Sequence, residues 1–106
     1  MTSDQRKYPR IAKPVEAVWR GASPGSSVSR IADIGWGGCF LQARAEPAIG
    51  ERIEIVVTIG DKKIMLTGSV VYLERPIGFS VQFDPFTKEQ IDVLKDLLGE
   101  PPASAG

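Results

Sequence analysis

The sequence predicts an all-β fold, namely a six-stranded antiparallel β-barrel with one C-terminal α-helix. Three observations predict it. Six short segments rich in β-branched and aromatic residues follow one another, with turn residues between them. The connections are short enough for strands that are neighbours in sequence to pair as a meander. The one segment with helical periodicity comes last, so we expect the helix to cap the barrel.

A length of 106 residues fits one domain with its own core. Hydrophobic residues make up 42% and charged residues 25% of the chain, and the formal net charge is zero. This composition is typical of a globular protein, and it gives no overall attraction to nucleic acid. We divide the chain into a flexible basic N-terminal arm (residues 1–13), a barrel with its helix (14–98) and a disordered tail (99–106).

The strands are expected where apolar and polar residues alternate between turn residues. They cover residues 15–20, 28–34, 38–43, 51–59, 64–73 and 77–83. The last segment has the clearest period of two, with Phe79, Val81 and Phe83 on one face. Gly68, inside the fifth segment, predicts a bulge or a sharp bend that helps a small sheet to curl. Trp19, near Val15 and Val18, is expected in the core or on the barrel surface.

The helix has recognisable signals at both ends. Thr87 and Gln90 fit a capping box, in which each side chain bonds the other residue's backbone amide. An apolar stripe follows, made of Ile91, Leu94, Leu97 and Leu98. Gly99 is expected to end the helix.

Residues 30–41 combine two apolar runs with a glycine-rich turn that carries one carboxylate, Asp33. The turn glycines are expected to permit positive φ angles; they are Gly35, Gly37 and Gly38. Backbone amides beside Asp33 and the indole of Trp36 can then meet a flat, polar, partly anionic ligand such as a nucleotide. Alternatively, the glycines merely close a hairpin and Asp33 caps its own turn.

A second cluster lies upstream in the arm, where Arg6 and Arg10 flank Pro9. A guanidinium can bond bidentately to the O6/N7 edge of guanine or to a phosphate, and a carboxylate can accept from guanine's amino and imino groups. Arginine and aspartate together therefore read opposite edges of guanine. The alternative for the arm is an ordinary solvated basic N-terminus.

Together the two clusters resemble the PilZ family, whose signature is an Arg-x-x-x-Arg arm followed by Asp/Asn-x-Ser-x-x-Gly. Arg6 and Arg10 match the arm, and Asp33 and Gly38 match the two ends of the turn motif. Gly35 stands where the family usually has serine. The resemblance runs from about residue 5 to about residue 98 and includes the segments at 49–50, 68–72 and 77–83.

The resemblance implies a bacterial cyclic di-GMP receptor domain, because PilZ domains generally bind this nucleotide. Arg6 and Arg10 would contact guanine and phosphate, Asp33 a guanine edge, and Gly38 would shape the turn. The hydroxyl missing at Gly35 should weaken binding by roughly threefold to tenfold, since a neutral hydrogen bond contributes about 0.5 to 1.5 kcal/mol. Trp36, which we do not expect to be fully buried, could compensate by stacking on a base; alternatively it packs over the barrel end.

Other chemistry is poorly represented. The chain has no histidine, so catalysis by a histidine dyad or triad is excluded. Cys39 is expected to be a buried, inert thiol, and there is no cysteine cluster for zinc. We therefore predict no enzyme, no metal and no cofactor. A single cysteine and the lack of a long apolar segment favour a reducing cytoplasm without membrane insertion.

Three functions stay open, and we rank them in this order. The first is a cyclic di-GMP receptor whose arm becomes ordered on binding and is read by an unidentified protein partner. The second is a PilZ-like interaction module that does not bind nucleotide, which the missing serine favours. The third is a small-barrel binder of DNA or RNA, which the zero net charge and the scarcity of aromatic residues among the basic ones oppose. A monomer or weak dimer is expected.

Overall fold

The computed structural model describes residues 10–11, 15–22 and 27–101. Within these ranges the chain forms seven strands and one helix. They are β1 (Arg10–Ile11), β2 (Val15–Arg20), β3 (Ser27–Gly35), β4 (Gly38–Gln42), β5 (Arg52–Ile59), β6 (Lys62–Glu74), β7 (Gly78–Phe83) and α1 (Lys88–Leu98).

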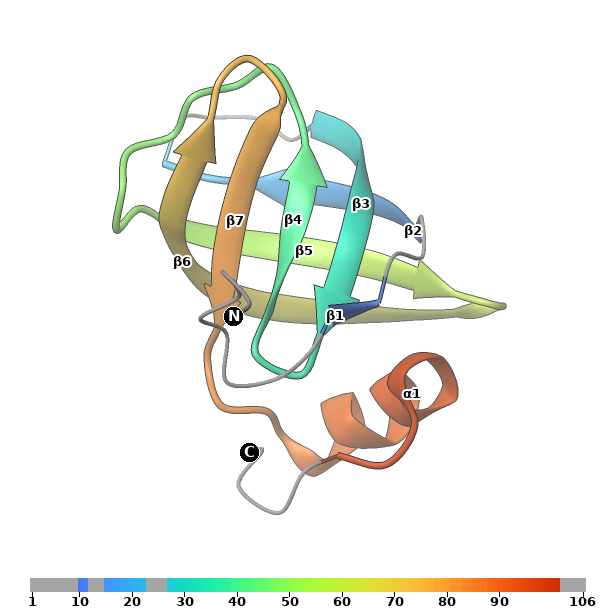
Figure 1. Cartoon of the computed structure of the whole chain (residues 1–106). Coiled ribbons are helices and arrows are strands. Elements are labelled where there is room, and N and C mark those ends of the chain that lie inside the picture. The colour runs from blue at the N-terminus through green and yellow to red at the C-terminus, as the bar shows by residue number, and fades with distance from the viewer. Residues whose placement is uncertain (1–9, 12–14, 23–26, 102–106) are drawn as a thin grey trace, which may run out of the picture.

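Strands β2 to β7 form a closed antiparallel barrel, as the sequence predicts. The strand order is β1-β3-β2-β5-β6-β7-β4, and β4 also pairs with β3, which closes the sheet on itself (Figure 1). Strand β1 was not predicted. It falls inside the expected N-terminal arm and pairs with β3 beyond the end of β2, with Arg10 opposite Gly35 and Ile11 opposite Ile34.

Strand β6 connects two sides of the barrel. Its residues 62–69 pair with β5 and its residues 68–74 pair with β7. Gly68 is opposite Ile53 of β5 on one side and Phe83 of β7 on the other. A Cβ atom at Gly68 would collide with the carbonyl oxygen of Gln82, so glycine permits the close approach of β7. The sequence predicted a bulge or a sharp bend at Gly68; the bulge is not there, because the register shift in β6 lies between Val70 and Tyr72.

The barrel interior is apolar. Alternate residues of β2, β5 and β7 are buried, as the period of two requires. The ring of Trp19 meets Phe79 edge to face, with centroids 5.1 Å apart, and its indole Nε1 donates to the Ser29 hydroxyl at 3.0 Å. Trp19 is therefore a core residue with a satisfied donor, in agreement with the sequence. Cys39 is fully buried, also as predicted.

Helix α1 covers one end of the barrel beside β5 and β6 (Figure 1). The predicted capping box is present: the amide of Gln90 donates to the Thr87 hydroxyl at 3.1 Å, and the amide of Thr87 donates to Gln90 Oε1 at 2.8 Å. Leu94 is fully buried and Gly99 caps the C-terminus. In the part of the chain that the structure describes, no helix has the length and apolarity that crossing a membrane requires.

Candidate functional site

A β-bulge decides which way Asp33 faces. Strand β3 pairs Ile31 with Leu41 and then Asp33 with Phe40, so Ala32 is an extra residue opposite β4. Ile31 and Ile34 are both fully buried. Since neighbouring strand residues face opposite sides, Asp33 lies on the outer face of the barrel. Without the extra residue, a carboxylate two positions after the buried Ile31 would point into the core.

The same turn brings two motif positions together through the backbone. By strand alternation Gly35 is on the same face as Asp33, two residues further along β3; it is buried, and it is opposite Arg10 of β1. The arm's second arginine position is therefore anchored beside the turn. The structure describes the backbone of Arg10 and not its side chain, and Arg6 lies outside the described residues.

The turn glycines do not adopt the conformation that we expected. Among the described glycines, positive φ angles occur at Gly50, Gly60 and Gly99. Gly35 and Gly38 are instead regular ends of β3 and β4, and Gly38 is opposite Gln82 of β7. The hairpin thus needs no left-handed residue at these positions, and a side chain at position 35 is not opposed by φ.

Trp36 packs over the barrel end, which is the alternative to base stacking that the sequence left open, and it is almost but not fully buried. Its side chain is 7% exposed and packs edge to face on Phe86, with ring centroids 5.7 Å apart. Phe86 precedes α1 and also contacts Phe83, so this aromatic group supports the turn from the barrel end. Within the described ranges, the buried indole Nε1 of Trp36 has no hydrogen-bond acceptor. Stacking of Trp36 on a base stays a prediction, and it now requires the ring to leave Phe86.

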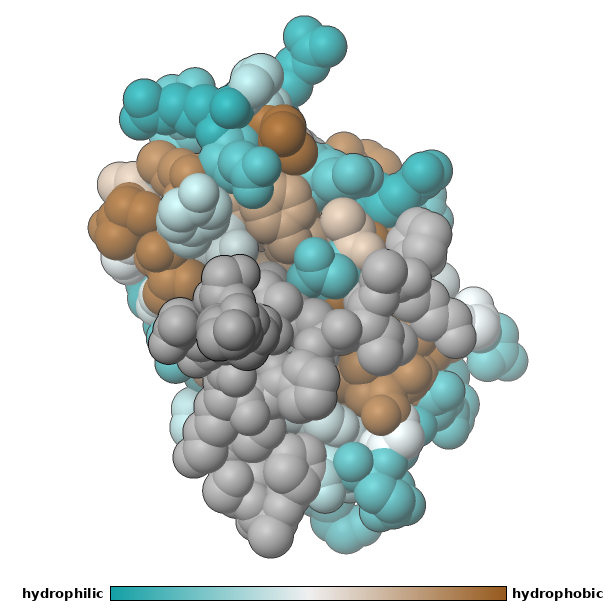
Figure 2. Space-filling view, in the orientation of Figure 1, coloured by the Kyte–Doolittle hydropathy of each residue, from teal (hydrophilic) through white to brown (hydrophobic). Residues whose placement is uncertain are grey.

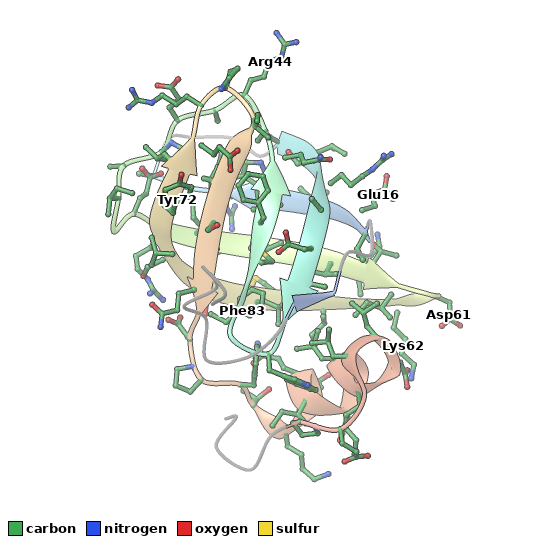
Figure 3. All side chains as sticks on the ribbon, viewed as in Figure 1. Glu16, Arg44, Asp61, Lys62, Tyr72 and Phe83 are labelled. Carbon is green, nitrogen blue, oxygen red and sulfur yellow. The ribbon has the colours of Figure 1, made fainter. Side chains whose placement is uncertain are left out.

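The register adds residues that sequence reasoning missed. Phe40 of β4 is opposite both Asp33 and Ser80, and Ser80 is opposite Tyr72 of β6. Phe40 and Ser80 are outward positions, because their chain neighbours Cys39, Leu41, Phe79 and Val81 are fully buried, and Asp33 and Tyr72 are their cross-strand partners. Tyr72 is 56% exposed and projects from β6 (Figure 3). Where residues are coloured in Figure 2, hydrophobic and hydrophilic side chains are interspersed on this face.

A second row of outward residues crosses β2, β3 and β4 next to the first. Glu16 is opposite Arg30, and Arg30 is opposite Gln42. All three side chains are exposed, and with Val28 and Ser29 they line an open groove of about 700 Å³. Within the described ranges, no ion pair or hydrogen bond joins the Glu16 carboxylate to the Arg30 guanidinium. The row therefore presents an acceptor and a donor side by side.

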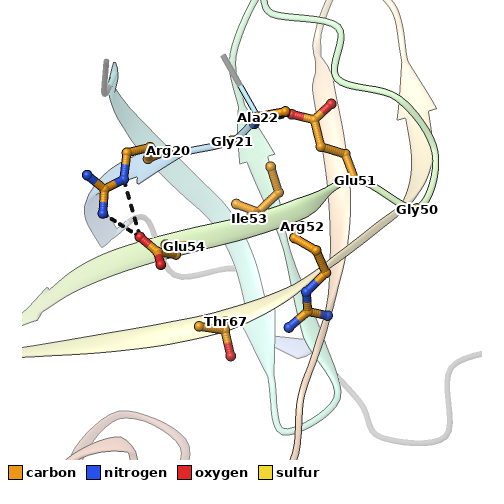
Figure 4. Close-up of a pocket in the computed structure, with 9 residues that line it drawn as sticks. All are labelled: Arg20, Gly21, Ala22, Gly50, Glu51, Arg52, Ile53, Glu54 and Thr67. Atoms are coloured by element: carbon orange, nitrogen blue, oxygen red, sulfur yellow. Dashed lines mark hydrogen bonds and ion pairs between the residues drawn. The ribbon is translucent and has the colours of Figure 1, made fainter. Parts of the chain in front are cut away.

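Another groove, of about 630 Å³, lies between β2, β5 and β6 (Figure 4). Its charged groups already have partners. Arg20 Nη2 is 2.6 Å from Glu54 Oε1, and Glu51 accepts from the amides of Ala22 at 2.8 Å and Ala48 at 2.9 Å. These amides lower the pKa of Glu51. The groove is thus built of structural contacts that fasten the loops after β2 and before β5.

Asp84 fastens the start of the segment that leads from β7 to the helix. It accepts two hydrogen bonds from the Arg52 guanidinium and one from the Thr67 hydroxyl at 2.5 Å. These donors lower the pKa of Asp84. Its backbone amide also donates to the Thr67 carbonyl at 2.9 Å. Asp84 is therefore a structural carboxylate.

Among the described residues, no group of three or more histidine, cysteine, aspartate or glutamate side chains could hold a metal ion.

Comparison with known proteins matches residues 4–100 to the model of the PilZ domain family. The fold is similar to the solved PilZ domain of CeSA from a cellulose-synthesizing bacterium, with a TM-score of 0.68, 12% identity, and coverage of 84% of this chain and 94% of that chain. It is also similar to the Bacillus subtilis inhibitor of motility MotI/DgrA, with a TM-score of 0.65 and 10% identity, covering 88% of this chain and 49% of that one. A search of curated proteins finds no match.

Proposed function

This chain belongs to the PilZ domain family, and on that premise we propose that it is a receptor that binds cyclic di-GMP on the outer face of its barrel. PilZ domains are generally receptors for this nucleotide and not enzymes. The ligand would lie over the turn between β3 and β4, with Asp33 at a guanine edge and Arg6 and Arg10 at guanine and phosphate. Gly38 would shape the turn.

The observation that carries the proposal is the bulge at Ala32. It turns Asp33 outward, two residues from Gly35, which is opposite Arg10 of β1. A bulge that re-aims one side chain is common beside functional sites. Here the re-aimed group is the carboxylate of the family motif, and the neighbouring chain position is the second arginine of the arm.

Signal output would come from the arm. Residues 10–11 are anchored to β3 through two backbone partners, and the sequence around them is basic. We propose that the ligand's phosphates neutralise Arg6 and Arg10 and order the arm over the turn, and that an unidentified protein partner reads the new surface. Fixing each backbone residue costs about 1 to 2 kcal/mol, which the arginine contacts must offset.

A competing function is a protein-interaction module that does not bind nucleotide. The specific observation in its favour is Gly35, which lacks the hydroxyl that the family usually offers. We rank it second because one neutral hydrogen bond contributes only about 0.5 to 1.5 kcal/mol. We also propose a cytoplasmic location, because the one cysteine, Cys39, is a free thiol that a reducing compartment keeps reduced.

Isothermal titration calorimetry with cyclic di-GMP, GTP and single-stranded RNA tests the proposal. We expect binding of cyclic di-GMP with a micromolar or lower Kd, and weaker or no binding of the other two. Absence of heat at high micromolar cyclic di-GMP would favour the interaction module. Preferential binding of the RNA would favour a nucleic-acid binder.

Amide hydrogen exchange tests the output step separately. Residues 6 to 9, which precede β1, should gain protection when cyclic di-GMP is saturating, because this part of the arm becomes ordered, whereas residues 10–11 already pair with β3. Equal protection with and without nucleotide, in a protein that binds it, would show that another surface carries the signal.

A further inference from the structure

We propose that Glu16 and Arg30 read the second guanine of cyclic di-GMP, and so form a base-specificity site distinct from the Asp33 turn. This inference rests on the proposed function. The family motif contains neither Glu16 nor Arg30. The pairing of β2 with β3 places the two residues side by side.

The first argument is their placement. Glu16 and Arg30 are direct cross-strand partners on the outer face, since their neighbours Val15, Ala17 and Ile31 are buried. The Cβ atoms of directly opposed strand residues are about 4.5 to 5.5 Å apart. Both side chains line the open groove of about 700 Å³. A planar base can therefore approach the carboxylate and the guanidinium from the same side.

The second argument is that this pair differs from the other charged pairs of the barrel. Arg20 and Glu54, also opposite each other on neighbouring strands, form an ion pair with a hydrogen bond of 2.6 Å. Arg52 is held by Asp84. Glu16 and Arg30 form no such bond within the described ranges, so their hydrogen-bonding groups remain available for a ligand.

The third argument is chemical complementarity. Around the perimeter of guanine, two donors (the 2-amino group and N1–H) are followed by two acceptors (O6 and N7). A carboxylate accepts from the donor pair, and a guanidinium donates bidentately to the acceptor pair. Glu16 beside Arg30 supplies the two in the matching order. Adenine presents an acceptor at N1 and a donor at its 6-amino group, so the same pair disfavours it.

The fourth argument is position relative to the first site. The bulge at Ala32 brings Arg30 and Asp33 onto one face, although they are an odd number of residues apart. The row of Arg30 meets β4 at Gln42, and the row of Asp33 meets it at Phe40. These two positions are two residues apart along β4, so the rows are separated by about 7 Å. Two bases carried by one small cyclic dinucleotide can therefore meet both rows. Val28, 73% exposed, adds an apolar contact at the edge of the groove.

Calorimetry with Glu16→Gln and Arg30→Gln tests the proposal, with Glu54→Gln as the matched control from the other cross-strand pair. The ligands are cyclic di-GMP and cyclic di-IMP, which lacks the 2-amino groups. Glu16→Gln and Arg30→Gln should each weaken cyclic di-GMP binding roughly tenfold, and Glu54→Gln should leave it unchanged. Glu16→Gln should also reduce the preference for cyclic di-GMP over cyclic di-IMP, because the variant lacks the carboxylate that accepts a hydrogen bond from the 2-amino group of guanine.

The outcomes separate the two proposals. Wild-type binding of cyclic di-GMP that neither variant weakens beyond the Glu54→Gln control would overturn the second-guanine site and leave the receptor function intact. Weakening by Glu16→Gln with an unchanged preference over cyclic di-IMP would also overturn it, because the carboxylate would then act only through general electrostatics. Absence of binding by the wild type would overturn the receptor function itself. Thermal unfolding of each variant checks that the fold is retained.

Discussion

Restoring a hydroxyl at position 35 should tighten nucleotide binding. Gly35 lies on the outer face of β3 beside Asp33 and opposite Arg10, and its φ angle is not in the positive range. A serine there is compatible with this backbone conformation, and on this face its hydroxyl would be directed toward the proposed ligand. Removing the flexibility of glycine lowers the entropy of the unfolded chain, but Gly35 is buried, so thermal unfolding of Gly35→Ser is measured first to show that the added atoms fit.

The expected gain is that of one hydrogen bond. A net contribution of about 0.5 to 1.5 kcal/mol corresponds to a Kd for cyclic di-GMP that is roughly threefold to tenfold lower. Gly35→Ala is the matched control, because it adds the same Cβ atom without the hydroxyl. Calorimetry should give the order Gly35→Ser tighter than the wild type, with Gly35→Ala equal to the wild type or weaker.

Two results would refute this reasoning. If Gly35→Ser and Gly35→Ala bind equally, the hydroxyl meets no ligand atom and the turn does not contact the nucleotide as proposed. If both variants lose binding while they remain folded, the ligand approaches the backbone at Gly35 so closely that even a Cβ atom is excluded. Gly35 would then be a requirement of this site rather than a missing serine.

Three further predictions concern the site and the frame that holds it. Asp33→Ala and Arg10→Ala should each weaken cyclic di-GMP binding at least tenfold in calorimetry with little change in Tm; unfolding of Asp33→Ala would instead support the turn-capping role. Asp84→Asn should lower stability at pH 7 by about 1 kcal/mol, a value reduced for the carboxylate's 33% exposure. Because folding lowers the pKa of Asp84 from its ordinary value of 3.8, this contribution is present above that value and is lost as the pH falls through the folded pKa. The difference in free energy of unfolding between Asp84→Asn and the wild type, measured by chemical denaturation, should therefore disappear as the pH falls below about 4. A difference that does not depend on pH would contradict this role of Asp84. Gly68→Ala should lower the stability by about 1 to 3 kcal/mol, because its Cβ atom would meet the backbone of Gln82. In a thermal melt this corresponds to a Tm decrease on the order of 5 to 20 °C. An unchanged Tm would show that β7 can move away.

The elements that the sequence predicted are those with a strong local signal. The alternation in β7 correctly places Phe79 and Val81 in the core and Phe83 half-buried against it. The reciprocal bonds of Thr87 and Gln90 form where the capping box predicts them. Both signals depend on residues close together in the chain, which is why pattern reasoning found them.

The orientation of the site could not be read in the same way. A strict period of two through β3 would place Asp33 on the same side as Ile31, inside the barrel. The extra residue at Ala32 reverses this, and it is defined only by the pairing with β4. The rows that join Asp33 to Phe40 and Glu16 to Arg30 likewise depend on which strands pair and in what register. Such contacts are long-range, and no local pattern specifies them.

The turn itself shows a different kind of error. Three closely spaced glycines suggested left-handed conformations, yet two of them are ordinary strand ends. The indole of Trp36 is buried because Phe86, fifty residues later in the chain, packs on it. Burial by a distant segment overrides the polar character of the neighbouring turn residues.

The central claim is that cyclic di-GMP binds on the outer face at the turn between β3 and β4. Titration of ¹⁵N-labelled protein with this nucleotide, followed through the backbone amide resonances, tests it most directly. The account predicts the largest shifts at Arg10, Asp33, Gly35 and Gly38, with the distant loop at Gly60 nearly unchanged. Shifts confined to the groove around Glu51, or no shifts at millimolar nucleotide, would contradict it.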